Sequence, residues 1–91
     1  VVIAGCSHSG ICNIVDYACA GTGRNDIAAV IGGFHLKEGS QAIDPTMSYL
    51  KSRKIRLLMP CHCVDASVIK LLHAEMPCEP VFSGRRVDFT C

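Results

Sequence analysis

Three histidines recur at a fixed interval along this chain, and each follows a short apolar run. His8, His35 and His62 are separated by 27 residues each time. The last of them stands between two cysteines, Cys61 and Cys63. Imidazole and thiolate are the softer metal ligands of proteins, so these side chains have the chemistry to bind a metal ion such as zinc.

The interval of the histidines has a structural interpretation. One strand, one helix and their two turns together take about 25 to 30 residues. If each histidine ends a strand, all three reach the same edge of a parallel sheet, where open α/β sheets bind ligands. The alternative is that the equal spacing reflects only chance and the usual length of such a unit. A tandem repeat is not indicated, because the segments between the histidines share no pattern.

Short apolar runs alternate with helix-like segments along the whole chain. We expect strands at 1–4, 27–31, 55–59, 81–82 and 87–89, and helices at 10–20, 45–53 and 64–76. Ser9 is the expected cap of the first helix, Gly21 its end, and Asp65 or Ser67 the cap of the last helix. The order βαβαβαββ, without an internal linker, predicts one α/β unit over residues 1–91.

The composition excludes several classes of partner. The net charge of +1 offers no electrostatic footprint for nucleic acid, and no apolar run approaches the roughly 18 residues of a membrane span. Seven cysteines, an odd number without a familiar disulfide framework, predict a reducing, cytoplasmic setting and no native disulfides. The chain begins at Val1 inside a strand-like run, so we expect a fragment of a larger protein. A missing amino-terminus would hide any signal peptide.

Two further patterns concern the predicted site. His8 lies just before a predicted helix start, where backbone amides attract anions, although a polar turn is the alternative there. In the segment 61–63, three adjacent side chains are too cramped to bind one zinc ion easily, because neighbours in an extended segment point to opposite sides. His62 alone is therefore the expected ligand of that segment. His73 has no partner at ligand spacing and is interpreted as an ordinary surface or boundary residue.

Three motifs make the chain resemble a known enzyme family. They are Gly-Cys-Ser-His-Ser-Gly-Ile at 5–11, Ile-Gly-Gly-Phe-His-Leu at 31–36 and Pro-Cys-His-Cys at 60–63. In this order they resemble the carboxyl-terminal half of metallo-β-lactamase-fold hydrolases, and more narrowly the branch named for a dihydropterin–ribofuranosylaminobenzene-phosphate synthase. The resemblance implies half of an αββα sandwich. It also implies that the main metal motif, His-x-His-x-Asp-His, lies in an amino-terminal half outside this chain.

The resemblance also implies roles for the histidines. His8 and His62 match metal-site positions, and His35 matches a site-edge histidine that binds metal, holds substrate or moves a proton. The intact enzyme would hold two zinc ions and act on a small-molecule substrate, phosphorylated compounds included, through a metal-activated water. We expect the fragment to be inactive alone. Ser9 stands where the family commonly has alanine, and Val64-Asp65 where it commonly has Thr-Gly.

Other functions remain open from the residues alone. The branch name implies a pterin-precursor synthase rather than a hydrolase, and the fold does not settle a substrate. A non-catalytic zinc-stabilised module built on cysteine and histidine is the alternative from another class. A third alternative is a small α/β binding domain with no metal.

Overall fold

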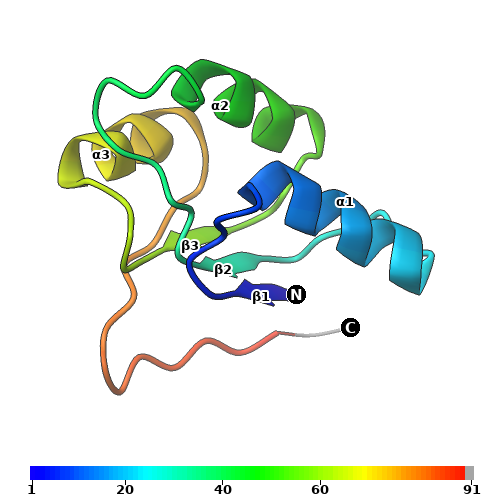
Figure 1. The fold of residues 1–91 in the computed structure, drawn as a ribbon. Coiled ribbons are helices and arrows are strands. Elements are labelled where there is room, and N and C mark those ends of the chain that lie inside the picture. Colours follow the sequence, from blue (N-terminus) through cyan, green and yellow to red (C-terminus); the bar gives the residue numbers. More distant parts are fainter. Residues whose placement is uncertain (90–91) are drawn as a thin grey trace.

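The computed structural model of the chain describes residues 1–89 and consists of three strand–helix units in succession (Figure 1). The elements are β1 (Val2–Ala4), α1 (Ile11–Thr22), β2 (Val30–Gly32), α2 (Ile43–Ser52), β3 (Leu58–Pro60) and α3 (Ala66–Glu75). The strands form one parallel sheet in the order β1-β2-β3. The predicted α/β class and the alternation of strands and helices are confirmed. None of the described helices is both long and apolar enough to cross a membrane.

The sheet has a register that differs from the histidine interval by one residue. Val2 is opposite Val30, and Val30 is opposite Leu58, so equivalent positions are 28 residues apart. The same offset continues past the strands, where Leu36 forms an isolated bridge with Val64. The number of residues between a strand end and the histidine that follows it therefore decreases by one from each strand to the next.

The three helices lie on one face of the sheet (Figure 1). Side chains alternate between the two faces of a strand. Val30 and Leu58 are fully buried and belong to the core cluster, which places them on the helical face. Ile3 and Ile31 are opposite each other one position further along, on the other face, and Ile3 is 77% exposed. This second sheet face is therefore apolar and incompletely covered.

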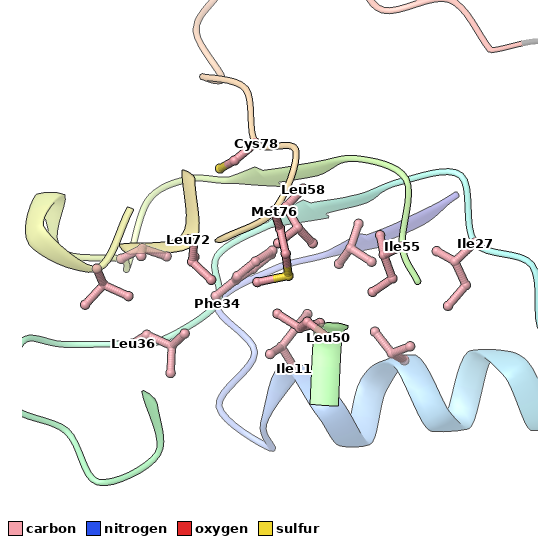
Figure 2. Packing of buried hydrophobic residues seen from close by; sticks show 14 of the residues in the cluster. Ile11, Ile27, Phe34, Leu36, Leu50, Ile55, Leu58, Leu72, Met76 and Cys78 are labelled. Atoms are coloured by element: carbon pink, nitrogen blue, oxygen red, sulfur yellow. The ribbon is translucent and has the colours of Figure 1, made fainter. Parts of the chain in front are cut away.

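The core lies between the sheet and the helices. Ile11 of α1, Leu50 of α2 and Phe34 of the segment after β2 meet there (Figure 2). Leu72 of α3 is also fully buried. Burial of such side chains stabilises a fold by about 1.5 to 3 kcal/mol each. Because Phe34 directly precedes His35, this packing fixes the backbone that carries one of the site histidines.

The ends of α1 differ from the prediction. Ser9 does not cap the helix, because Gly10 occupies the N-cap position and no side chain caps the first turn. The helix continues through Gly21 and ends at Gly23, whose N–H donates to the carbonyl of Cys19 at 2.9 Å. Gly23 has a φ of 71°, in the left-handed region that glycine adopts without a steric cost.

The start of α2 and the starts of two strands also differ from the prediction. The helix begins at Ile43, two residues before the expected Pro45, because the Ser40 hydroxyl accepts the N–H of Ala42 and forms a turn ahead of it. β2 and β3 begin three residues later than expected. Ile27 and Ile55, the expected first residues of these strands, are buried in the core but precede the regular ladder.

The two strands predicted at 81–82 and 87–89 are absent, which corrects that part of the predicted order. A lone two-stranded hairpin is at best marginally stable in water. Residues 77–79 instead add to the edge of β3, where Pro77 accepts the N–H of Leu58 and Glu79 donates to the Leu58 carbonyl, both at 2.9 Å. Residues 80–89 then run on the side of the sheet opposite the helices (Figure 1).

Candidate functional site

The three predicted histidines all follow the carboxyl ends of strands. His8 comes four residues after the end of β1, His35 three after β2, and His62 two after β3. Because the strands are parallel, these ends form one edge of the sheet. The structure thus places all three imidazoles at the edge that their spacing predicts.

Two of the three imidazoles are in contact. The ring centroids of His8 and His35 are 4.6 Å apart, and the rings are tilted by 55°. His62 lies at the same edge, but no ring contact joins it to either of the others in residues 1–89. All three side chains are exposed, so each ring can reach a ligand from solvent.

The backbone at this edge is strained. Ser7, His35 and His62 have φ values of 56°, 52° and 63°, in the left-handed region. That conformation costs a residue other than glycine about 1 to 2 kcal/mol. Such residues concentrate at ligand-binding sites, where the surrounding structure holds them in place. Two of the three histidines are therefore held in conformations that a free segment would avoid.

Two cysteines meet at the same edge, a pairing that their spacing in the sequence did not predict. The thiol of Cys63 donates to the carbonyl oxygen of Cys6 at 3.2 Å. Burial, followed by the hydrogen-bonding and charge effects of the neighbouring Cys63 side chain, raises the pKa of Cys6. Gly33 of the middle segment makes this contact possible, because a Cβ there would lie 2.7 Å from the Cys63 sulfur. A Gly-Gly pair after a strand was the only signal of this close approach.

Hydrogen bonds tie the segments after β2 and β3 together. Leu36 donates its N–H to the Cys63 carbonyl, and Asp65 donates its N–H to the Leu36 carbonyl, both at 3.1 Å. The Asp65 carboxylate accepts the N–H of Glu38 at 2.7 Å. Asp65 occupies the N-cap position of α3 as expected, but its side chain makes no capping hydrogen bond. Its carboxylate instead fixes the segment that follows His35.

The turn between β1 and α1 contains a buried hydroxyl. Ser7 is 6% exposed, and its Oγ has no hydrogen-bond partner among the described residues. The Ser7 carbonyl accepts the N–H of Gly10 at 2.9 Å, which closes the turn. The first turn of α1 holds no acidic residue and no side-chain cap. Its amide dipoles therefore favour an anion near His8, as the sequence suggested.

The donor groups of this chain fit part of a metal site and not a complete one. In residues 1–89, no group of three histidine, cysteine, aspartate or glutamate side chains is arranged to hold a metal ion. A catalytic zinc needs three protein ligands with an open position. His73 lies apart from the edge in α3, where its Nδ1 is 3.0 Å from the Cys78 carbonyl oxygen. The imidazoles of His8 and His62 are exposed at the sheet edge and free to accept further ligands.

Comparison with known proteins identifies related sequences. The chain is 36% identical over 92 residues to the 7,8-dihydropterin-6-methyl-4-(β-D-ribofuranosyl)-aminobenzene-5′-phosphate synthase of Methanocaldococcus jannaschii, covering 98% of the chain and 31% of that protein. It is 42% identical over 73 residues to an uncharacterized protein of the same organism, covering 79% of the chain and 27% of that protein. No protein-family model matches the chain.

A solved structure shares the fold. The crystal structure of a metal-dependent hydrolase of the β-lactamase superfamily matches with a TM-score of 0.81 and 27% sequence identity, covering 98% of the chain and 36% of the solved chain. The chain therefore spans about a third of the proteins that it matches. The resemblance to metallo-β-lactamase-fold hydrolases, seen in three motifs, is confirmed. The mixed α/β unit has the fold of part of such a protein.

Proposed function

We propose that this chain is the carboxyl-terminal part of a zinc-dependent enzyme of metallo-β-lactamase fold and that it supplies His8 and His62 as metal ligands. The observation that carries the proposal is the gathering of three exposed imidazoles at the carboxyl edge of one parallel sheet. The likeness to a metal-dependent hydrolase supports it, because the shared fold covers 98% of the chain. The remaining ligands would come from an amino-terminal half of the same domain.

Imidazole donors suit zinc, and we propose two ions in the intact enzyme. When bound, zinc supplies an activated water and polarises the substrate bond that is cut. The chain's own contribution is to hold the imidazoles ready. The left-handed backbone of His62 and the packing of Phe34 beneath His35 restrict the orientations of the two imidazole rings. Less entropy is therefore lost when the rings bind a ligand. His35, beside His8, is the proposed group that holds substrate or moves a proton at a ring nitrogen.

The substrate that we propose is a small molecule that carries a phosphate. The start of α1 lies beside His8 and has no acidic residue in its first turn. A buried hydroxyl, that of Ser7, lies in the same turn without a partner in the described residues. The relative named as a synthase of a 5′-phosphate supports a phosphorylated compound, either as the substrate of a hydrolase or in pterin-precursor synthesis. We propose a cytoplasmic location, which the free thiols of the described cysteines support, with no nucleic-acid or membrane partner.

The incompletely covered sheet face is the proposed contact with the missing half. Ile3, which is 77% exposed, is opposite Ile31 there, while the helices cover the other face. Large exposed apolar patches mark surfaces that pack against other protein. A second sheet in this place would complete the αββα sandwich.

Zinc titration tests the proposal. We expect the 91-residue chain alone to bind zinc weakly and to show no phosphodiesterase or lactamase turnover, because two good ligands leave a catalytic site incomplete. In the product of the longer reading frame, we expect tight binding that His8→Ala and His62→Ala each abolish. His73→Ala is the matched control and should leave binding unchanged. Tight binding that survives both site substitutions would overturn the proposal.

The same titration addresses the alternative of a zinc-stabilised cysteine and histidine module. Such a module gathers three or four thiolates or imidazoles around one ion, and no such group occurs in the described part of the chain. If the module is the right interpretation, replacing the cysteines by serine abolishes zinc binding. Under our proposal, the cysteine variants retain it.

A further inference from the structure

We propose that Cys6 and Cys63 form a redox-active thiol pair, which a small-molecule disulfide converts into an intramolecular disulfide. The pair joins the segment after β1 to the segment after β3. These two strands are not neighbours, because β2 lies between them. The inference rests on the contacts of the two cysteines and stands independently of the proposed metal site.

The middle segment is shaped to let the two side chains meet. Adjacent strands are about 4.8 Å apart, so the ends of β1 and β3 are separated by roughly twice that distance. Gly33 lies between them and has no side chain. A Cβ on Gly33 would lie 2.7 Å from the Cys63 sulfur and 3.1 Å from the Cys6 Cα. The Cys63 side chain thus crosses over Gly33 and reaches Cys6.

The two cysteines are already in contact in the reduced form. The Cys63 sulfur is 3.2 Å from the Cys6 carbonyl oxygen, to which the Cys63 thiol donates a hydrogen bond. Both side chains are half-buried, so a small oxidant can reach them. A disulfide requires the two Cβ atoms to lie about 3.5 to 4.5 Å apart, which is the geometry that oxidation of this pair would adopt.

The remaining described cysteines lack this arrangement. Cys19 and Cys78 are buried, each only 7% exposed, and belong to the hydrophobic core. Cys12 contacts Thr46, and burial is the main reason that its pKa is raised. Cys61 is half-buried and free. Cys61 is therefore a control in nearly the same sequence position as Cys63.

The reaction is an ordinary thiol–disulfide exchange with two displacements. The thiolate of one cysteine attacks a sulfur of the small disulfide, forming a mixed disulfide and releasing one small thiolate. The thiolate of the second cysteine then attacks the protein sulfur of that mixed disulfide and releases the second small thiolate. The two protein thiols lose two electrons, the small disulfide gains them, and the released thiolates take up the two protons.

Oxidised glutathione is the probe for the experiment. The 91-residue chain is incubated with it in buffer, quenched in acid, alkylated and mapped by mass spectrometry. We expect a crosslink between the peptide that holds Cys6 and the peptide 57–70, with Cys63 as the linked residue. The same oxidation in concentrated urea gives the reference distribution of pairs. Native conditions should enrich the Cys6–Cys63 link at least several-fold over that reference.

Three variants separate this pair from its neighbours. Cys6→Ser and Cys63→Ser should each lose the crosslink and retain a glutathione mixed disulfide on the remaining partner. Cys61→Ser, the matched control, should retain the crosslink in full. Pairing of Cys6 with Cys61 or Cys12 in the native wild-type chain, or no enrichment over the urea reference, would overturn the proposal. This wild-type comparison decides the question even if a variant fails to fold.

Discussion

Tyr49 of α2 donates its hydroxyl hydrogen to the carboxylate of Asp16 on α1, so one hydrogen bond joins the two helices. Arg53, the C-cap residue of α2, donates to the same carboxylate oxygen at 2.5 Å and to the Tyr49 hydroxyl at 3.0 Å. The bond from Tyr49, followed by that from Arg53, holds the pKa of Asp16 below its ordinary range. Tyr49 also packs against the hydrophobic core, so this polar cluster links the two helices beside the core.

The lowered pKa of Asp16 predicts a pH-dependent stability. The ionised carboxylate stabilises the fold above the unfolded pKa of about 3.9, and this contribution is lost as the pH falls through the folded value. We therefore expect Asp16→Asn to lower the free energy of unfolding at pH 6 and to have little effect near pH 2. Urea denaturation at several pH values measures the difference. Asp26→Asn, which breaks a local pair with Arg24 within one loop, is the control and should cost less. A difference that does not change with pH would contradict the prediction.

Gly33 has no room for a side chain. Gly33→Ala would place a Cβ 2.7 Å from the Cys63 sulfur and 2.9 Å from the Gly5 carbonyl oxygen. We expect a loss of about 1 to 3 kcal/mol in the free energy of unfolding, the usual cost of overpacking. Gly21→Ala in α1 is the control, because nothing lies within 4 Å of its added Cβ. That change should stabilise the chain by about 0.5 to 1 kcal/mol, since alanine favours helix.

The backbone conformation of His62 predicts an unusual ranking of the stabilities of variants at this position. With a φ of 63°, glycine should be tolerated at this position, whereas a β-branched residue should be strained. We expect His62→Val to be about 1 to 2 kcal/mol less stable than His62→Gly, as measured by urea denaturation. Both variants lack the imidazole, so they should weaken zinc binding equally in the intact protein. Equal stability of the two variants would show that the turn relaxes when the histidine is replaced.

The two faces of the sheet should respond differently to substitution. Leu58 is fully buried on the helical face, and Leu58→Ala should cost about 2 to 5 kcal/mol. Ile3→Asn on the other face should change the free energy of unfolding by less than about 0.5 kcal/mol, because Ile3 is 77% exposed. Ile3→Asn should also reduce self-association of the chain in analytical ultracentrifugation. A large loss of stability for Ile3→Asn would mean that this face is covered.

The strand-and-helix order could be predicted because it depends on local patterns. Buried runs followed by amphipathic segments identify strand–helix units, and the placement of the histidines at one edge follows from parallel strands alone. The ends of α1 were predicted less well. Gly21 and Gly23 are both able to end a helix, and the bond from Gly23 to Cys19 decides between them only in the folded chain.

The thiol pair could not be predicted from spacing, because it depends on three segments at once. Cys6 and Cys63 lie 57 residues apart and meet only because Gly33 separates them without a side chain. The contact of His8 with His35 could not be predicted from spacing either. The two histidines are 27 residues apart, whereas paired strand positions are 28 apart, so the histidines are offset by one residue along the sheet edge. This offset depends on the strand register, which only the folded sheet defines. The role of Asp65 likewise depends on the distant N–H of Glu38.

The open sheet face around Ile3 makes the free energy of unfolding of this chain depend on the concentration of any protein segment that packs on that face. Any segment that packs on that face binds the folded chain and not the unfolded one, so it shifts the folding equilibrium by mass action. At one hundred times its dissociation constant, such a segment adds about 2.7 kcal/mol to the free energy of unfolding. A segment joined covalently has a fixed effective concentration, often in the millimolar range, whereas a separate one is diluted with the sample. The melting temperature of the isolated chain is therefore expected to rise when a segment that packs on this face is added.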